Sequence, residues 1–228
     1  MNDAYSTATG PGDRFAKELR GFGPLGVVAI VVILASQTLA PLSAILVLLW
    51  VTLSRTPWAE IGYVRPRSWL VEATAGIALG VVLKFLLKII VMPLLGADAI
   101  NRTYHYIVGN PAAAISEILP LIIVGGFAEE TVFRGYLFER FGKLIGKSIV
   151  AKSGTVLVTA LFFASLHFYD QGFAGVEQAI FTGLVFGTVF SSTGRIWIVM
   201  CAHAAYDLTA LAIIYWNLES EFAHLVFK

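Results

Sequence analysis

The chain has 228 residues, of which 57% are hydrophobic and only 14% are charged. Soluble domains carry about 25% charged residues, and a body of this size leaves much of its surface exposed, so the solvent must be lipid. Disorder is excluded, because it requires low hydrophobicity and high charge. The formal net charge of +1 excludes an electrostatic nucleic-acid binder, and the single cysteine excludes a disulfide framework.

Hydrophobicity divides the chain into a polar segment at the membrane surface (residues 1–22), an integral membrane domain (23–216) and a tail (217–228). The membrane domain contains apolar stretches at residues 23–53, 70–95, 115–138, 154–168, 176–190 and 196–216. A single span needs about 20 residues, so the first stretch is long for one crossing and short for two, and a break at Pro41 would make it a helical hairpin. The pattern predicts an all-α fold, a polytopic transmembrane helical bundle with six or seven membrane crossings.

Positive charges indicate the orientation of this bundle. The linkers 54–68 and 140–152 are basic, whereas the tail is acidic. Under the positive-inside rule both linkers lie in the cytoplasm, and residues 96–116 lie on the opposite side. The expected location is a bacterial plasma membrane, with the protein as an integral, multi-pass component.

Small residues and lysines recur at helical spacing within the spans. Pairs of glycines four residues apart let helices approach closely, so we expect packing contacts at Gly76 and Gly80 and at Gly183 and Gly187. Lys84 and Lys88 share one helix face, and they either extend to the membrane surface or line a cavity.

Ionisable residues inside a span usually face a protein interior or a cavity. In the third stretch, Glu130 and Arg134 are four residues apart and can form an ion pair on one helix face. Glu129 points about 100° away and is left without a local partner, which makes it a candidate general base. The structural alternative is a Glu130–Arg134 clamp, with Glu129 satisfied by a neighbouring helix.

Two histidines occur in later spans. His167 follows Phe163 by one turn, and His203 precedes Asp207 by one turn. Each could be a buried packing residue, and His203 with Asp207 could also be an oriented base or part of a metal site. Counted along their helices, Glu129, His167 and His203 lie roughly 10–20 Å from the expected cytoplasmic ends. A shared depth favours one polar site over independent packing residues.

The motifs Glu-Glu-x-x-x-Arg, Phe-x-x-x-His and His-x-x-x-Asp, in this order on the spans, resemble those of the CAAX protease and bacteriocin-processing (CPBP, or Abi) intramembrane proteases, which include the type II CAAX prenyl protease. The resemblance covers the motif core, residues 128–207, with weaker similarity at 58–69. It implies an all-helical membrane endopeptidase in which Glu129 activates a water with help from His167. It also implies that His203 and its partner one turn later stabilise the oxyanion.

That partner is Asp207 here, where the eukaryotic branch of the family has asparagine. An ionised aspartate cannot donate to an oxyanion, so Asp207 is protonated, orients His203, or belongs to a metal shell. The remaining motif residues, Glu130, Arg134 and Phe163, are expected to support the site or the substrate.

The resemblance leaves the cofactor open. The family is often called a metalloprotease family, while a glutamate-dependent mechanism without zinc is also argued. No cofactor is assigned from the sequence, although zinc stays an alternative. A zinc site would use His167 and His203 with Glu129, and it would need further ligands that the sequence does not nominate.

The expected function is a CAAX-protease-like intramembrane endopeptidase that hydrolyses a peptide bond near the cytoplasmic membrane face, in a cavity that opens to the cytoplasmic side. Its partners are a peptide or protein substrate at the membrane and the lipid bilayer, with no nucleic acid. One alternative is a small ion-coupled transporter, since intramembrane carboxylates also mark ion pathways. The other is a catalytically inactive binding or immunity protein of the same fold.

Overall fold

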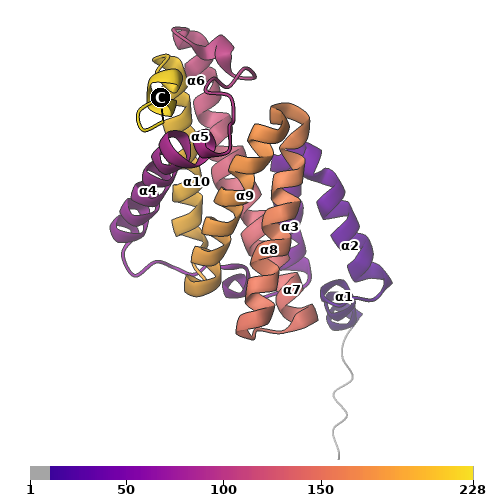
Figure 1. Cartoon of the computed structure of the whole chain (residues 1–228). Helices are drawn as coiled ribbons and strands as arrows, with labels where there is room; N and C mark the ends of the chain where they lie inside the picture. The colour runs from indigo at the N-terminus through magenta and orange to yellow at the C-terminus, as the bar shows by residue number, and fades with distance from the viewer. Residues whose placement is uncertain (1–10, 228) are drawn as a thin grey trace, which may run out of the picture. The chain divides into compact units, whose positions relative to one another are not determined.

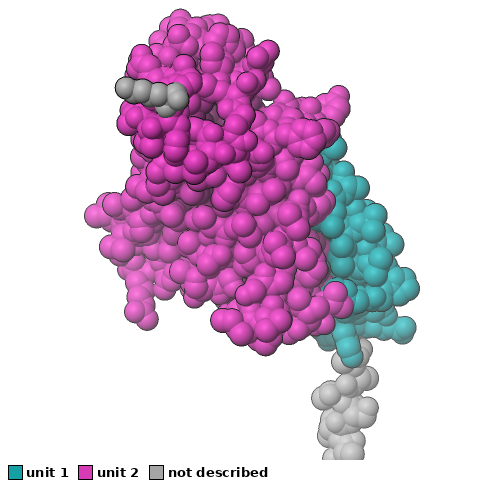
Figure 2. Space-filling view, in the orientation of Figure 1, with its two compact units in different colours: residues 1–58 teal, residues 59–228 magenta. Residues whose placement is uncertain are grey.

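The computed structural model describes residues 11–227, and the chain falls into two compact units, residues 1–58 and 59–228 (Figure 2). All regular structure in the described residues is helical. Five helices are long and apolar enough to cross a membrane, or six if the bent pair Gly12–Arg20 and Pro24–Leu39 forms one span. The predicted all-α polytopic bundle is therefore confirmed. The sequence predicts six or seven crossings and the structure contains five or six candidate spans, so six crossings agree with both.

The first unit contains the helices α1 (Pro11–Arg20), α2 (Pro24–Ala35) and α3 (Ala40–Leu53). A 3₁₀ turn, Ser36–Leu39, separates α2 from α3, and these two helices pack against each other as a hairpin (Figure 1). The helix break expected at Pro41 lies at Ser36–Leu39, and Pro41 itself is the second residue of α3, because proline is tolerated in the first turn of a helix. With 14 residues, α3 is about 21 Å long, shorter than a bilayer core of about 30 Å.

The second unit holds the remaining helices: α4 (Trp69–Leu86), α5 (Met92–Leu94), α6 (Pro111–Pro120), α7 (Leu137–Ile145), α8 (Ile149–Leu166), α9 (Phe168–Thr193), α10 (Ile196–Tyr215) and α11 (Glu219–Ala223). The π-helical segments η3 (Leu87–Val91), η5 (Leu121–Glu129) and η6 (Thr131–Tyr136) join α4 to α5 and α6 to α7. As a result, Pro111–Ile145 is one continuous helix. The predicted limits of the membrane domain, residues 23 and 216, stay a prediction.

Glycines bring α10 close to its neighbours. A Cβ atom at Gly80 would lie 2.0 Å from the carbonyl oxygen of Ala202, and one at Gly76 would lie 2.5 Å from another backbone oxygen of α10. A Cβ atom at Gly183 would lie 2.9 Å from Cα of Ala160, so α9 and α8 also approach closely. The predicted packing contacts are confirmed, and α10 lies against α4, α9 and η5.

Between the apolar stretches 154–168 and 176–190, the sequence predicts a loop outside the membrane at residues 169–175, and the structure differs from this prediction. Helix α9 begins already at Phe168 and is interrupted only at Gly172, where φ is +60°. Glycine adopts this conformation readily because it has no Cβ atom. The polar residues that suggest a loop therefore lie on a helix, and His167 lies at the junction, as the C-cap residue of α8.

Candidate active site

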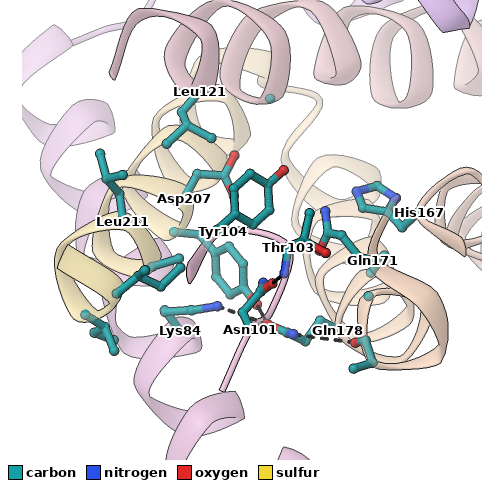
Figure 3. Close-up of a pocket in the computed structure, with 18 of the residues that line it drawn as sticks. Lys84, Asn101, Thr103, Tyr104, Leu121, His167, Gln171, Gln178, Asp207 and Leu211 are labelled. Atoms are coloured by element: carbon teal, nitrogen blue, oxygen red, sulfur yellow. Dashed lines mark hydrogen bonds between the residues drawn. The ribbon is translucent and has the colours of Figure 1, made fainter. Parts of the chain in front are cut away.

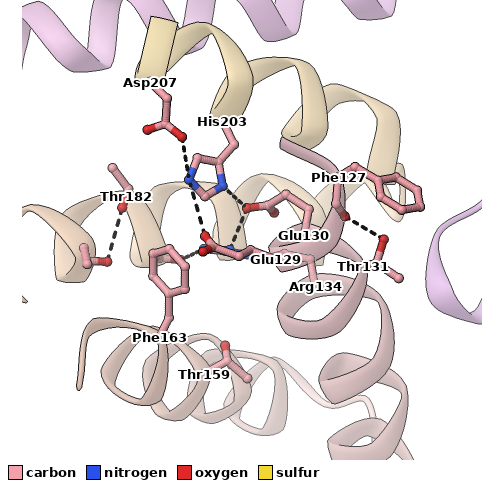
Figure 4. Close-up of polar contacts among 12 residues, drawn as sticks. Phe127, Glu129, Glu130, Thr131, Arg134, Thr159, Phe163, Thr182, His203 and Asp207 are labelled. Carbon is pink, nitrogen blue, oxygen red and sulfur yellow. Dashed lines mark hydrogen bonds and ion pairs between the residues drawn. The ribbon is translucent and has the colours of Figure 1, made fainter. Parts of the chain in front are cut away.

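A buried hydrogen-bonded cluster joins the first and the last of the three motifs (Figure 4). Oε1 of Glu130 accepts hydrogen bonds from Nη1 of Arg134 and from Nδ1 of His203, each at 2.7 Å. The exposed fractions of these three residues are 0%, 1% and 5%. The ion pair predicted from the spacing is therefore present. Its bond to His203, 73 residues away in the chain, is a contact that the sequence does not predict.

The bond to Glu130 determines which nitrogen of His203 carries a proton. A carboxylate only accepts hydrogen bonds, so Nδ1 of His203 is the donor. The other nitrogen, Nε2, faces Oδ2 of Asp207 at 3.6 Å and Oε2 of Glu129 at 3.8 Å. These distances exceed a direct hydrogen bond and are of the kind that a water or a substrate group bridges. The side chains of Glu129 and Asp207 are each 21% exposed, so both are accessible to such a group.

Two adjacent glycines let η5 approach α10 at this point. A Cβ atom at Gly125 would lie 2.4 Å from Oδ2 of Asp207 and 3.5 Å from Nε2 of His203. A Cβ atom at Gly126 would lie 2.9 Å from Cβ of Ala204. Neither glycine is predicted from the sequence as a site residue, although a Gly-Gly pair one turn before two glutamates indicates a close approach of helices at this point. Both are required for the contact between the carboxylates and His203.

Phe163 packs against both histidines. Its ring centroid lies 4.6 Å from that of His167 and 5.8 Å from that of His203, and Cζ of Arg134 lies 4.9 Å from it. Nδ1 of His167 donates to the carbonyl oxygen of Phe163 at 3.0 Å, which leaves Nε2 as an acceptor. No hydrogen bond joins His167 to Glu129 in the described part of the chain, and the two side chains instead line one cavity.

The cavity has a volume of about 450 Å³, and Glu129, Phe163, His167, His203 and Asp207 all contribute to its wall. Neither Glu130 nor Arg134 is among the residues that line it. Both are buried against protein, so this geometry favours the supporting role over the substrate role, and the roles themselves stay predictions.

The rest of the cavity wall combines apolar residues, such as Leu121 and Leu211, with polar ones (Figure 3). It includes Lys84, Lys88, Tyr104 and Gln178, so the cavity-lining alternative for the two lysines is correct. Burial raises the pKa of the Tyr104 phenol, with the nearby carboxylates adding to the effect, so this group remains protonated and able to donate.

A comparison with known families points to the same segment. Residues 111–209 match the family model described as the Rce1-like type II CAAX prenyl endopeptidases. The predicted family resemblance is confirmed. The Rce1-like segment contains every predicted site residue, from Glu129 to Asp207. The chain matches no curated protein and no solved structure.

The zinc alternative does not fit the geometry of the Rce1-like segment. The described residues contain no group of three or more His, Cys, Asp or Glu side chains placed to hold one metal ion. Nε2 of His203 faces Glu129 and Asp207, whereas no hydrogen bond or ion pair joins His167 to either carboxylate among the residues that the structure describes. The three residues nominated for zinc, these two histidines and Glu129, do not form one ligand shell, so no step of the reaction is assigned to a metal.

The position of the cavity bears on one expectation about the membrane. Its wall includes residues 98–104, the first half of α9 and Glu219, and it receives no residue from the basic linker 140–152. The cavity and this linker therefore lie toward opposite ends of the same Rce1-like helices. A cytoplasmic linker 140–152 and a cytoplasmic opening of the cavity cannot both hold, because depth along each helix does not say which end the cavity meets. The side of the membrane on which the cavity opens stays a prediction.

Proposed function

We propose that the protein is an intramembrane endopeptidase that hydrolyses a peptide bond in a peptide or protein substrate at the membrane. One observation carries the proposal: two partly exposed carboxylates, Glu129 and Asp207, flank Nε2 of His203 at the wall of a cavity. A carboxylate beside an oriented histidine is an arrangement suited to general acid–base catalysis. The Rce1-like match supports peptide-bond hydrolysis as the reaction class.

Glu129 is the general base in this mechanism. It takes a proton from a water molecule as the water oxygen attacks the carbonyl carbon of the scissile bond. His167 lines the same cavity with Nε2 as a free acceptor, and it accepts the other hydrogen of that water. Glu129 then gives its proton to the nitrogen of the leaving amine as the carbon–nitrogen bond breaks.

His203 stabilises the oxyanion. Glu130 holds the proton on Nδ1, so a second proton on Nε2 makes an imidazolium that donates to the developing negative charge. Asp207 faces the same nitrogen and favours this charged form before the oxyanion is present. Arg134 and Phe163 act through Glu130 and the histidine rings, and they are positioning residues.

The membrane side of the reaction follows from the charges of the loops. Short loops rich in Lys and Arg remain in the cytoplasm, and the basic linker 140–152 is remote from the cavity. The cavity therefore opens on the non-cytoplasmic side in this proposal, which replaces the cytoplasmic opening expected from the sequence. Substrates would then approach from that side of the membrane.

Glu129→Gln tests the function. Loss of a general base typically lowers the rate about 10²–10⁴-fold, and we expect cleavage to fall by this factor with an unchanged folded yield. Glu117→Gln is the matched control, because it removes another carboxylate from the same cavity wall, one that bonds to the hydroxyl of Tyr106.

Comparative proteomics of membranes with the wild type and the two variants provides the measurement. Peptides that require Glu129 but not Glu117 would be products of the enzyme. Identical peptides in all three membranes would overturn the proposal and favour a transporter or an inactive binding protein.

A further inference from the structure

Two lysines one turn apart on the helix α4–η3 line the cavity, and they differ in their partners. Nζ of Lys88 forms an ion pair with Oε1 of Glu219 at 3.2 Å. Nζ of Lys84 instead donates to the amide oxygen Oε1 of Gln178 at 2.9 Å and lies 4.7 Å from the ring centroid of Tyr206. Among the described residues, no carboxylate forms an ion pair with Lys84. Only one of the two positive charges is therefore neutralised by a direct partner.

The ammonium group of Lys84 is fixed in place by neutral groups. Oε1 of Gln178 also accepts a hydrogen bond from the hydroxyl of Tyr206 at 3.1 Å, so both partners of the ammonium are themselves held. Figure 3 shows Lys84 and Gln178 joined at the cavity wall. Lys84 is only 9% exposed. A buried cation with neutral partners is destabilising until an anion reaches it, and a carboxylate would do so through a charge-assisted hydrogen bond.

The ammonium group of Lys84 is placed where it can bind a group of the substrate, and no acidic group of the described residues occupies this position. Tyr206 follows His203 by three residues on α10, which is about 4.5 Å along the helix axis. The nearest cavity carboxylate on this helix, Asp207, faces Nε2 of His203. A peptide whose scissile bond lies at His203 can thus extend along the same wall to Lys84 within a few residues.

We infer that Lys84, fixed by Gln178 and Tyr206, forms a subsite that binds a carboxylate of the peptide substrate. The inference rests on the proposed function, because it takes the cavity to be the place where the peptide binds. The carboxylate can belong to the C-terminus of the peptide or to an acidic side chain, and the two sources share the chemistry that Lys84 recognises.

Binding to the full-length Glu129→Gln protein in detergent tests this subsite without cleavage. The probes are N-acetyl-trialanine as the free acid, the same peptide as the C-terminal amide, and N-acetyl-Ala-Glu-Ala as the amide. Hydrogen bonds to charged groups correspond to about 10–100-fold in affinity, so we expect at least one acidic probe to bind more tightly than the uncharged amide by this factor. The acidic probe that does so identifies the source of the carboxylate.

Lys84→Met, added to Glu129→Gln, is expected to remove the preference for the acidic probe. Lys88→Met combined with Glu219→Gln is the matched control, since it removes a paired charge without leaving its buried partner alone, and it is expected to keep the preference. Folding is checked by thermal denaturation, in which Lys84→Met should not lower stability, because an apolar side chain of similar volume replaces an unpaired buried charge.

Equal affinity for the acidic and uncharged probes, no binding of any probe, or a preference that survives Lys84→Met would each overturn the subsite. The proposed function fails separately, because it depends on cleavage. A preference for acids that requires Lys84, in a protein whose membranes show no Glu129-dependent products, would leave a binding site without a protease.

Discussion

At the scale of single residues, one oxygen atom connects the parts of the site. Oε1 of Glu130 accepts hydrogen bonds from both Arg134 and His203, while Oε2 has no hydrogen-bond partner among the described residues. Loss of either donor would leave this buried carboxylate with one hydrogen bond fewer. Glu130 therefore links the stability of its helix to the orientation of the imidazole.

Arg134→Ala is expected to lower the free energy of unfolding by about 3–5 kcal/mol, because it leaves the charge of Glu130 buried without its cation. Folded yield and thermal denaturation in detergent measure the effect. Arg102→Ala is the matched control, since Arg102 forms an exposed ion pair with Asp98 and should change stability by less than about 0.5 kcal/mol. Equal stability of the two variants would contradict a structural clamp.

Asp207→Asn separates two roles of this side chain. If Asp207 acts through His203, asparagine loses the charge that favours the imidazolium, but its amide oxygen can still accept from Nε2 and its amide group can donate to an oxyanion, so the variant should retain substantial activity. A neutral amide in a metal shell would behave differently, because even changes around metal ligands lower activity about 10–100-fold.

Chelation of the same preparations completes this test. We expect wild-type activity to persist after exhaustive chelation, with metal content followed by mass spectrometry. Stoichiometric zinc, together with activity that chelation removes and zinc restores, would overturn the metal-free mechanism.

At the scale of elements, the π-helical segments explain why the two adjacent glutamates reach one ring. In an α-helix, neighbouring side chains diverge by about 100°, and this geometry separates Glu129 from Glu130 in the sequence analysis. In the structure, Glu130 bonds to Nδ1 of His203 and Glu129 faces Nε2. The two π-helical segments, η5 and η6, meet at these glutamates, and π turns are frequent at functional sites.

Local contacts could be predicted from the sequence, whereas contacts between helices could not. The Glu130–Arg134 pair follows from i,i+4 spacing, which brings side chains together on any helix. The Glu130–His203 bond requires η5 to approach α10, and this approach depends on Gly125 and Gly126. A glycine four residues from another indicates close packing, but it does not name the helix that packs there.

Gly125→Ala is expected to reduce cleavage about 10²-fold, because its Cβ atom would displace the carboxylate of Asp207, and displacements of about 1 Å have effects of this size. Cleavage rate and thermal stability are measured together. Gly154→Ala on α8 is the matched control, since a Cβ atom there meets open space and should stabilise the helix by up to about 1 kcal/mol. Wild-type cleavage by Gly125→Ala would remove Asp207 from the site.

At the scale of the whole membrane unit, the cavity and the basic linker lie toward opposite ends of the helices. The sequence predicts the spans and the sign of the net charge of each loop, because both follow from local composition. It does not predict the end at which the cavity opens, since the wall is assembled from α4, α6, α9, α10 and the segment 98–104.

Single-cysteine variants test the orientation. Cys201 is the one cysteine of the chain, so Cys201→Ala provides the background for Arg102→Cys beside the cavity and Lys147→Cys in the basic linker. A membrane-impermeant maleimide added to intact cells is expected to label the first variant, and the second only after permeabilisation. The reverse pattern would show that the cavity opens to the cytoplasm and that this chain breaks the positive-inside rule.

The π-helical segments also make the orientation of the site depend on the number of residues in each turn of the helix. A hydrogen bond from i to i+5 encloses one residue more than the α-helical bond from i to i+4. If the same number of residues instead closed into ordinary α turns, each residue absorbed by the π turns would be added to the α-helical count. The pair Glu129-Glu130 would then be rotated by about 100° relative to α6 for each such residue. A homologue with every motif residue in place would be inactive if this segment formed α turns, so its activity depends on the hydrogen-bond pattern of the helix as well as on the identity of its residues.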